Sequence, residues 1–306
     1  MTMARFETGM AVMCDDHRLT QLAPALDEAQ ELGVDWAELP LDTMNVIAGG
    51  RIVPSQRDRL KAIAAGRPIR LSTHSTIALN FMADPGHLPL HLDVARACVD
   101  LSAEIGARRM VIHTGSVVSR DPSVIAQAYD RQREAMRRLG DHAAAAGVLV
   151  CVENIFPATD DHHTASPAML ARELEAIAHP AIRGTFDFSH GFINCSHSGR
   201  DFPSEAEALA PLAAHLHIHD SFGRPRTFRV HSESEALAFG IGDLHLPPGW
   251  GEMNWDVLLE RLAFPADAVF MLELDKRFWP EIADAVAATR ALANRARPLD
   301  PAERVA

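Results

Sequence analysis

The feature of this sequence that most constrains its fold is a repeated alternation of two kinds of segment. Short β-branched or apolar runs alternate with longer stretches of helical periodicity, a pattern that indicates repeated βα units and a parallel sheet. We count eight such units. Eight parallel strands close into a barrel whose functional groups gather at the carboxyl ends of the strands. We therefore predict an α/β protein that folds as a single (β/α)8 TIM barrel.

The strands and helices can be placed along the chain. The expected strands cover residues 6–13, 36–40, 69–74, 110–113, 148–153, 184–188, 215–220 and 268–274. Between them, apolar residues recur at helical spacing, as at Leu22, Leu26 and Ala29, and each such stripe is expected to pack against the barrel. Ser166 followed by Pro167 predicts the start of another helix.

The chain is long enough for one barrel with insertions. Its 306 residues compare with about 250 for a typical barrel. We expect a barrel domain over residues 1–297 and a C-terminal tail over 298–306. Residues from about 222 to 253 show no clear periodicity, and unstructured loops longer than about 15 residues are uncommon unless they are functional or disordered. Because this stretch carries Asp243 and His245, we predict an inserted active-site loop.

The charge balance and hydropathy bear on partners and location. The chain has 29 Lys and Arg residues against 41 Asp and Glu, a net charge of -12, which disfavours nucleic acid as a partner because such binding relies on phosphate neutralisation. No segment has the roughly 18 unbroken apolar residues of a spanning helix, and the start MTMARFETGM lacks the regions of a signal peptide. We therefore expect a cytoplasmic protein without membrane contact and leave its oligomeric state open.

Residues with metal-binding side chains recur where the expected strands end. The nine candidates are His74, His113, Glu153, Asp187, His190, His217, Asp243, His245 and Glu273. Taken singly, each has an ordinary explanation, such as a salt-bridged carboxylate or a packed histidine at the barrel rim. Their recurrence at nearly every strand end from the third to the eighth favours one shared site. A ligand set of oxygen and nitrogen without sulfur suits Zn, Mn or Fe.

One segment, HLHIHDS, offers three histidines in place of one. Strand alternation directs the side chains of His215, His217 and His219 to the same face, so the local pattern does not decide which of them binds a metal. The four cysteines are scattered without any C-x-x-C pair, so neither a disulfide framework nor a thiolate zinc site is indicated.

The ordered motifs STHSTIALNF, VIHTG, VENIF, FDFSH, HIHDS, DLHLPPGWG and LELD extend over nearly the whole chain. Together they resemble the xylose-isomerase-like TIM barrel superfamily, which includes sugar phosphate isomerases, epimerases and endonuclease IV. The similarity is greatest to the three-metal endonuclease IV branch. The isomerase branch typically needs only the ring of Glu153, Asp187, His217 and Glu273 around one metal. The endonuclease branch adds the other five candidates.

The resemblance implies a distribution of the ligands over three metal ions per chain. His74, His113 and Glu153 would bind the first ion. Glu153 would also bind the second ion, together with Asp187, His217 and Glu273, and so bridge the two ions. The third would be bound by His190, Asp243 and His245. The sequence departs from the endonuclease pattern at Ser75, Thr76 and Thr114, which follow the first two histidines. These departures affect loop shape and weaken an assignment to DNA repair more than the metal assignment.

With three metals, the expected chemistry is hydrolysis of a phosphoester in a small sugar-like or glycerol-like substrate. Two metals about 3.5 to 4 Å apart can share a hydroxide and stabilise both the attacking and leaving oxygens at phosphorus. Glu153 and Glu273 would be the catalytic carboxylates. Three loop arginines could clamp a phosphate, namely Arg224, Arg226 and Arg229.

The alternative is a metal-dependent isomerase or epimerase of a small sugar or sugar phosphate. Glu153 and Glu273 would then transfer protons on opposite sides of the substrate, while one metal polarises its oxygens. Glu38, at the end of the second strand, would contact a sugar hydroxyl. A non-catalytic metal-binding scaffold is the third hypothesis, and it is disfavoured because an open site built from many strands costs stability that metal storage does not require.

Overall fold

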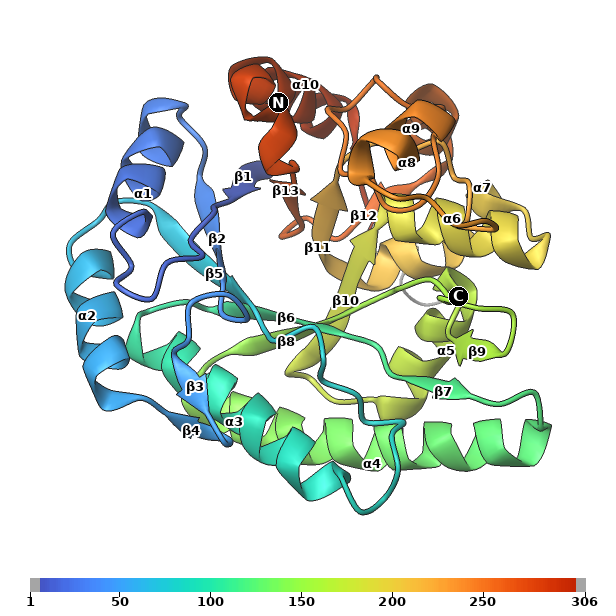
Figure 1. Ribbon diagram of the computed structural model, residues 1–306, viewed down its shortest axis with the longest axis horizontal. Helices are drawn as coiled ribbons and strands as arrows, with labels where there is room; N and C mark the ends of the chain where they lie inside the picture. The colour runs from blue at the N-terminus through green and yellow to red at the C-terminus, as the bar shows by residue number, and fades with distance from the viewer. Residues whose placement is uncertain (1–5, 301–306) are drawn as a thin grey trace.

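The protein is a closed barrel of eight parallel strands, which confirms the predicted fold. The structure, a computed structural model, describes residues 6–300. The strands follow one another around the barrel in the order β1, β13, β11, β10, β8, β6, β5, β2. Figure 1 shows the helices outside the strands, with the colour running around the ring from the blue α1 to the red α10. Within residues 6–300, no helix combines the length and apolar character needed to cross a bilayer.

The barrel strands lie where the sequence pattern predicts them, with ends that shift by a few residues. They are β1 Glu7–Ala11, β2 Trp36–Pro40, β5 Arg70–His74, β6 Arg109–His113, β8 Leu149–Glu153, β10 Ile182–Asp187, β11 Ala213–Ile218 and β13 Val269–Leu272. The expected seventh strand extended to Asp220, but regular pairing of β11 stops at Ile218, so that His219 and Asp220 lie on the loop that leaves the barrel.

The helices form the outer layer. They are α1 Leu22–Glu31, α2 Pro54–Ala64, α3 Leu88–Glu104, α4 Pro122–Ala146, α5 Pro167–Ile177, α6 Phe188–Ser198, α7 Phe202–Leu209, α8 Glu233–Phe239, α9 Trp255–Arg261 and α10 Ile282–Arg295, with short 3-10 turns η1 Ala210–Leu212 and η2 Lys276–Glu281. The predicted stripe of α1 is buried. The Ser166 hydroxyl accepts a hydrogen bond from the backbone N–H of Met169, so it caps α5 as predicted.

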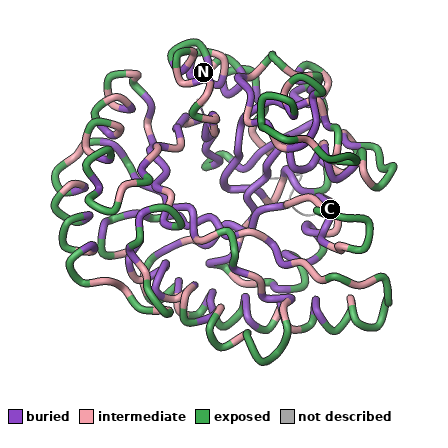
Figure 2. Tube along the Cα trace, in the orientation of Figure 1, coloured by how far each residue is buried: buried purple, intermediate pink, exposed green. Residues whose placement is uncertain are grey.

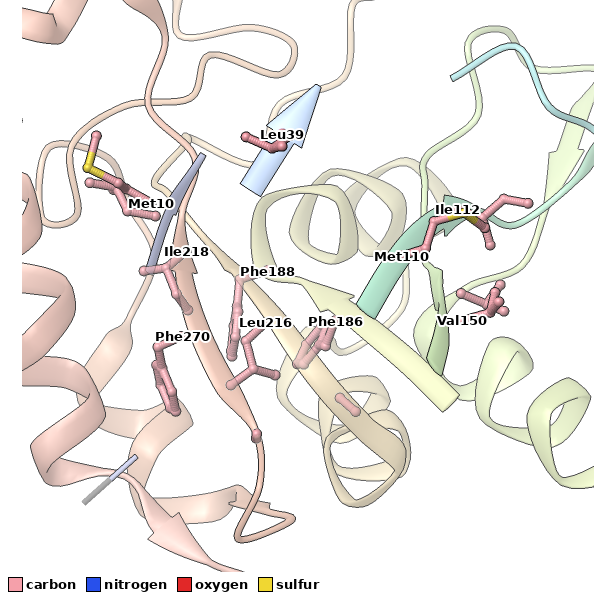
Figure 3. Close-up of a cluster of buried hydrophobic side chains, with 14 of the residues drawn as sticks. Met10, Leu39, Met110, Ile112, Val150, Phe186, Phe188, Leu216, Ile218 and Phe270 are labelled. Atoms are coloured by element: carbon pink, nitrogen blue, oxygen red, sulfur yellow. The ribbon is translucent and has the colours of Figure 1, made fainter. Parts of the chain in front are cut away.

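The core lies between the strands and the helices. Along β11, Leu216 and Ile218 point to this layer, whereas the alternate residues His215 and His217 point into the barrel. Figure 3 shows Leu216 and Ile218 beside Phe270 and Phe186 of neighbouring strands. Figure 2 shows buried segments along the strands and exposed segments along the outer turns of the helices. Alternation along β11 therefore separates packing residues from site residues, while Trp36, Val269 and Met271 of β2 and β13 form a second, smaller apolar cluster.

Three small two-stranded sheets lie outside the barrel sheet, and the sequence pattern did not predict them. They pair β3 Ile47–Ala48 with β4 Arg51–Ile52, β7 Ser116–Val118 with β9 His162–Thr164, and β12 Ala263–Phe264 with β14 Arg297–Pro298. Strands of two or three residues carry too little periodicity to detect in sequence. The pairing of β14 ties the start of the expected C-terminal tail to the barrel, and residues 301–306 of that tail lie outside the described residues.

The insertion over residues 222–253 contains the helix α8, which the sequence pattern did not indicate. Ser232 caps this helix by accepting a hydrogen bond from the N–H of Glu235, and Gly240 ends it in the left-handed conformation with φ of +64°. The buried carboxylate of Asp220 holds the returning chain, because it accepts hydrogen bonds from the N–H of Gly249 and the indole N–H of Trp255. A short helix, the buried Asp220 carboxylate and two backbone bridges, Asp220 with Leu246 and Arg224 with Ile241, therefore order this segment.

Candidate metal centre

The candidate ligands meet at the mouth of the barrel, at the carboxyl ends of the strands. A cavity of about 310 Å³ opens there. Its lining consists of Ala11, Glu38, Pro40, Asp42, Thr43, His74, Ile77, His113, Glu153, His190, Asp243, His245 and Glu273. Asp187 and His217 lie buried directly beneath it. All nine predicted ligand residues are thus brought together, although they come from segments as far apart as residues 74 and 273.

The first group of ligands surrounds one nitrogen of His217. Its Nδ1 lies 3.2 Å from Oε1 of Glu153, 3.3 Å from Oε2 of Glu273 and 3.8 Å from Oδ2 of Asp187. Four ligand atoms placed tetrahedrally at about 2.1 Å from a zinc-like ion lie about 3.4 Å from one another. The three carboxylate oxygens therefore lie at distances from this nitrogen that are close to those between ligands of one ion.

The second group uses the other oxygen of Glu153. Nε2 of His74 lies 3.2 Å and Nε2 of His113 lies 3.5 Å from Glu153 Oε2. The two imidazole rings meet edge to face, with centroids 5.1 Å apart. Because the two oxygens of one carboxylate face two different groups, Glu153 has the geometry of a bridging ligand.

The third group lies on the side of the inserted loop. Oδ2 of Asp243 lies 3.1 Å from Nε2 of His190 and 2.7 Å from Nε2 of His245. His245 has a φ of +46°, a left-handed conformation that costs free energy for a residue with a side chain. The loop thus holds its histidine in an unfavourable backbone conformation that turns the ring toward Asp243.

The strand-to-helix turn after β10 is built by local hydrogen bonds. Asp187 caps α6, because its Oδ1 accepts a hydrogen bond from the backbone N–H of His190 at 2.7 Å. Asn154 pins the same turn: its amide donates to the carbonyl of Asp187 and accepts from the Asp187 N–H. Its own carbonyl oxygen lies 3.1 Å from Nδ1 of His190. Sequence reasoning missed Asn154, whose only signal was its place next to Glu153.

Two carboxylates of the site, Glu153 and Asp243, have lowered pKa values although burial opposes their charged forms. Burial opposes the charged form of Glu153, but the imidazoles of His217 and His113 outweigh it and hold the pKa of Glu153 well below its usual range. Burial likewise opposes ionisation of Asp243, and the nearby His245 and His190 keep its pKa well below the ordinary value. Anionic oxygens are therefore available as ligands or as bases at neutral pH.

The imidazoles divide into two classes. Burial disfavours the protonated ring of His74, but its hydrogen bond with Glu153 prevails and raises the pKa to about 9. Burial acts on His245 as well, where the charge of Asp243 prevails and raises the pKa to about 10. At His113 burial itself prevails and lowers the pKa to about 4. Without metal, protons on imidazoles balance the carboxylates, and bound cations would displace those protons.

His219, which the sequence pattern left undecided, lies within the same cluster. It is fully buried, and its Nε2 lies 2.9 Å from Oδ2 of Asp187. Its ring stacks on that of His245 with centroids 4.0 Å apart and an interplanar angle of 2°. With His245 and Glu273 it forms another set of side chains close enough to share an ion. His219 therefore supports the ligands of two groups at once.

The three loop arginines are not brought into the cavity lining. The Arg224 guanidinium pairs with Glu252 at 2.6 Å, and that of Arg226 pairs with Glu233 at 2.9 Å. Arg229 is exposed. Two of the three guanidinium groups thus already have carboxylate partners at the surface, and their predicted role as a phosphate clamp receives no support from this geometry.

Solved structures with the same fold cover nearly the whole chain. One described as a D-tagatose 3-epimerase-like protein is 18% identical with a TM-score of 0.68, and the match covers 94% of this chain and 96% of that one. The TTHB071 protein from Thermus thermophilus, soaked with ZnCl2, is 24% identical with a TM-score of 0.66 and coverage of 95% and 99%. The IOLI protein with a bound zinc atom is 14% identical, with a TM-score of 0.65 and coverage of 94% and 96%.

At these identities the similarity concerns the fold alone. No curated protein sequence matches the chain. The family of xylose isomerase-like TIM barrels matches residues 26–295, which include all nine candidate ligands and every barrel strand except β1. The chain therefore belongs to the xylose isomerase-like TIM barrel family.

Proposed function

We propose that this protein is a divalent-metal-dependent isomerase or epimerase of a small sugar. The observation that carries the proposal is the ring of Glu153, Asp187, His217 and Glu273, in which three carboxylates lie within 3.8 Å of one nitrogen of the histidine, below an open cavity. The cavity of about 310 Å³ is at the small end of ligand sites, as a monosaccharide requires.

The polarity of the cavity also favours a neutral sugar. Its lining contains carboxylates and imidazoles but, among the described residues, neither Lys nor Arg, so it offers a phosphate group no cationic side chain of these types. Carboxylates and imidazoles can bind hydroxyl groups from several sides. The similar solved structures described as sugar epimerases agree with this substrate class.

In this proposal the two glutamates act on one carbon of the substrate from opposite sides. The deeply buried Glu153 stays anionic, so it can accept the proton of a C–H bond next to the carbonyl. Glu273, whose side chain is 16% exposed, lies nearer the opening and can return a proton to the other face. A bound divalent cation would polarise the carbonyl and hydroxyl oxygens and so acidify that C–H bond.

Solvent-proton exchange tests the proposal directly. The protein is loaded in turn with Mn²⁺, Mg²⁺, Co²⁺ or Zn²⁺ and incubated in D2O with a panel of ketopentoses and ketohexoses. We expect deuterium at the carbon next to the carbonyl and a second epimer or aldose by NMR with at least one sugar. The variant E273Q should lose this exchange, whereas E252Q, a loop glutamate that pairs with Arg224 outside the cavity, should keep it. No exchange with any sugar or metal would contradict the proposal.

A second candidate function, hydrolysis of a small phosphoester, is favoured by one specific observation. Five further ligand-type residues form groups of their own beside the ring, and a single-metal isomerase does not need them. If the three groups each bind an ion, two of them share Glu153 and can present a hydroxide to phosphorus. Close to three equivalents of Zn, Mn or Fe per chain, together with turnover of a phosphoester such as glycerol phosphate diesters, would favour this function over the first.

A further inference from the structure

We propose that Glu38 is a positioning residue, which sets the tautomer and orientation of His217 so that the Nδ1 of this ring faces the metal site. The inference rests on the proposed metal dependence and concerns how the protein builds one ion site. It gives Glu38 a different part from the sugar contact predicted from sequence. Glu38 borders the floor of the cavity, but its side chain is only 1% exposed, and its closest polar contacts are with buried side chains of the barrel.

The contact between Glu38 and His217 crosses the barrel interior. Glu38 is on β2 and His217 is on β11, and two other strands separate them in the barrel wall. Oε1 of Glu38 nevertheless lies 3.0 Å from Nε2 of His217, and the two side chains are 1% and 0% exposed. At this depth solvent does not compete for the contact, so the carboxylate and the imidazole determine each other's orientation.

The two nitrogens of the His217 ring have different surroundings. Nε2 faces the Glu38 carboxylate, whereas Nδ1 faces oxygens of Glu153, Glu273 and Asp187. If a cation replaces the proton on Nδ1, the remaining ring proton would stay on Nε2 beside the Glu38 carboxylate, and the lone pair of Nδ1 would be free for the cation. In this arrangement Nε2 would donate a hydrogen bond to Glu38, and Nδ1 would be the metal ligand.

Glu38 is itself held in place from the other side. The Ser72 hydroxyl donates to Oε2 of Glu38 at 3.0 Å, and Nε2 of His215 lies 2.9 Å from the same oxygen. His215 is fully buried. The hydrogen bond from Ser72 and the close approach of His215 restrict rotation of the carboxylate, so that Oε1 stays directed at His217. Side chains from β5, β2 and β11 thus form a chain of contacts that leads to His217.

Glu38, His215 and His217 are close enough to one another to hold an ion themselves, but the surroundings favour the positioning role. An ion there would need the Nε2 of His217, while Nδ1 of the same ring faces the three carboxylates above. Histidine ligands in metal sites commonly donate their second N–H to a carboxylate, and loss of that partner typically weakens metal binding by about 10- to 100-fold.

The experiment measures metal affinity of the full-length protein by competition between Zn²⁺ or Mn²⁺ and a chelating dye. In E38Q we expect one ion per chain to bind about 10- to 100-fold more weakly. E38D keeps the charge but shortens the side chain by one methylene, so it should weaken the binding of the same ion. In the double variant E38Q/H217A the loss should equal that of H217A alone, because the two residues act on one site. The visible absorption of bound Co²⁺ should change in E38Q.

The control is E173Q, a buried glutamate that pairs with Arg133 away from the cavity. It should leave every ion and the Co²⁺ spectrum unchanged. Wild-type metal affinity in E38Q would overturn the inference, as would equal weakening of all ions with a lower unfolding temperature. Unchanged metal binding with a raised KM for a sugar would assign Glu38 to the substrate instead. A wild-type protein that binds no metal would contradict the proposed function as well.

Discussion

The two ends of this barrel are built from opposite kinds of polar chemistry. At the amino end of the strands, Trp36 is surrounded by matched partners: its indole N–H donates to Glu7, and the guanidinium groups of Arg70 and Arg109 lie 4.9 and 5.1 Å from its ring. Arg109, only 8% exposed, also donates to the backbone carbonyls of Ala214 and Asp267. Each of these groups has a partner supplied by the protein.

At the carboxyl end, by contrast, no arginine among residues 6–300 lines the cavity. Carboxylate oxygens lie 2.7 to 3.8 Å from imidazole nitrogens, and the balance of charge depends on protons. The two ends share one set of strands, so the difference does not come from the fold. The partners at the amino end are all supplied by the protein, whereas the proposed function assigns a cation and a substrate to the carboxyl end.

The largest effect is expected from Glu153, the carboxylate whose oxygens face two ligand groups. The substitution E153Q keeps the size of the side chain but removes the charge that both groups share. We expect turnover to fall by about 10²- to 10⁴-fold and the number of bound ions to decrease. Kinetics on the sugar panel and metal analysis of the dialysed protein measure these effects. An E153Q variant with normal metal content and turnover would refute the contrast between the two ends.

At the amino end, Arg109 should matter for stability and not for metal. We expect R109M to lower the free energy of unfolding by about 3 kcal/mol, because two carbonyls lose a charged donor. Denaturant unfolding measures this value, and metal content should stay the same. The matched variant is R183M, whose more exposed guanidinium pairs with Asp267 and which should cost less than about 1 kcal/mol. Equal losses in both variants would count against a special role for Arg109.

The stability of the metal-free protein should depend on pH in an unusual direction. His74 and His245 have pKa values raised from 6.5 to about 9 and about 10, so the folded state binds their protons more tightly than the unfolded state. Their stabilising contribution is complete below about pH 6.5 and is lost as the pH rises through 9 and 10. We expect the unfolding temperature to fall over this range without metal and to change much less with Zn²⁺. Parallel curves for the two forms would argue against proton-for-metal exchange.

The smallest effect is expected at the loop arginines. Arg226 pairs with Glu233 at the surface, and both side chains are about half exposed. R226A should therefore change the free energy of unfolding by less than about 1 kcal/mol. KM for a sugar should be unchanged, since the residue does not line the cavity. A clear rise in KM, above all for a phosphorylated substrate, would restore the phosphate clamp expected from sequence.

Much of the fold could be predicted because its signals are local. Alternation along each strand and the helical stripes between them specify eight βα units, and one barrel accommodates them. The helix α8 escaped prediction because seven residues are too few to show a helical period, and its cap at Ser232 stands in a run of polar residues. The three small sheets were not predicted either, because their strands are only two or three residues long.

The candidate site was likewise predictable in part. The sequence by itself determined that carboxylates and imidazoles end the strands, and a closed parallel barrel brings strand ends together. Only the tertiary structure decided which atoms meet: that Nδ1 of His217 faces the ring of carboxylates, that Glu38 crosses the barrel to Nε2, and that the loop arginines stay outside. The physical reason is that side-chain alternation has a period of two residues, whereas contacts across a barrel depend on register and curvature, which no local pattern encodes.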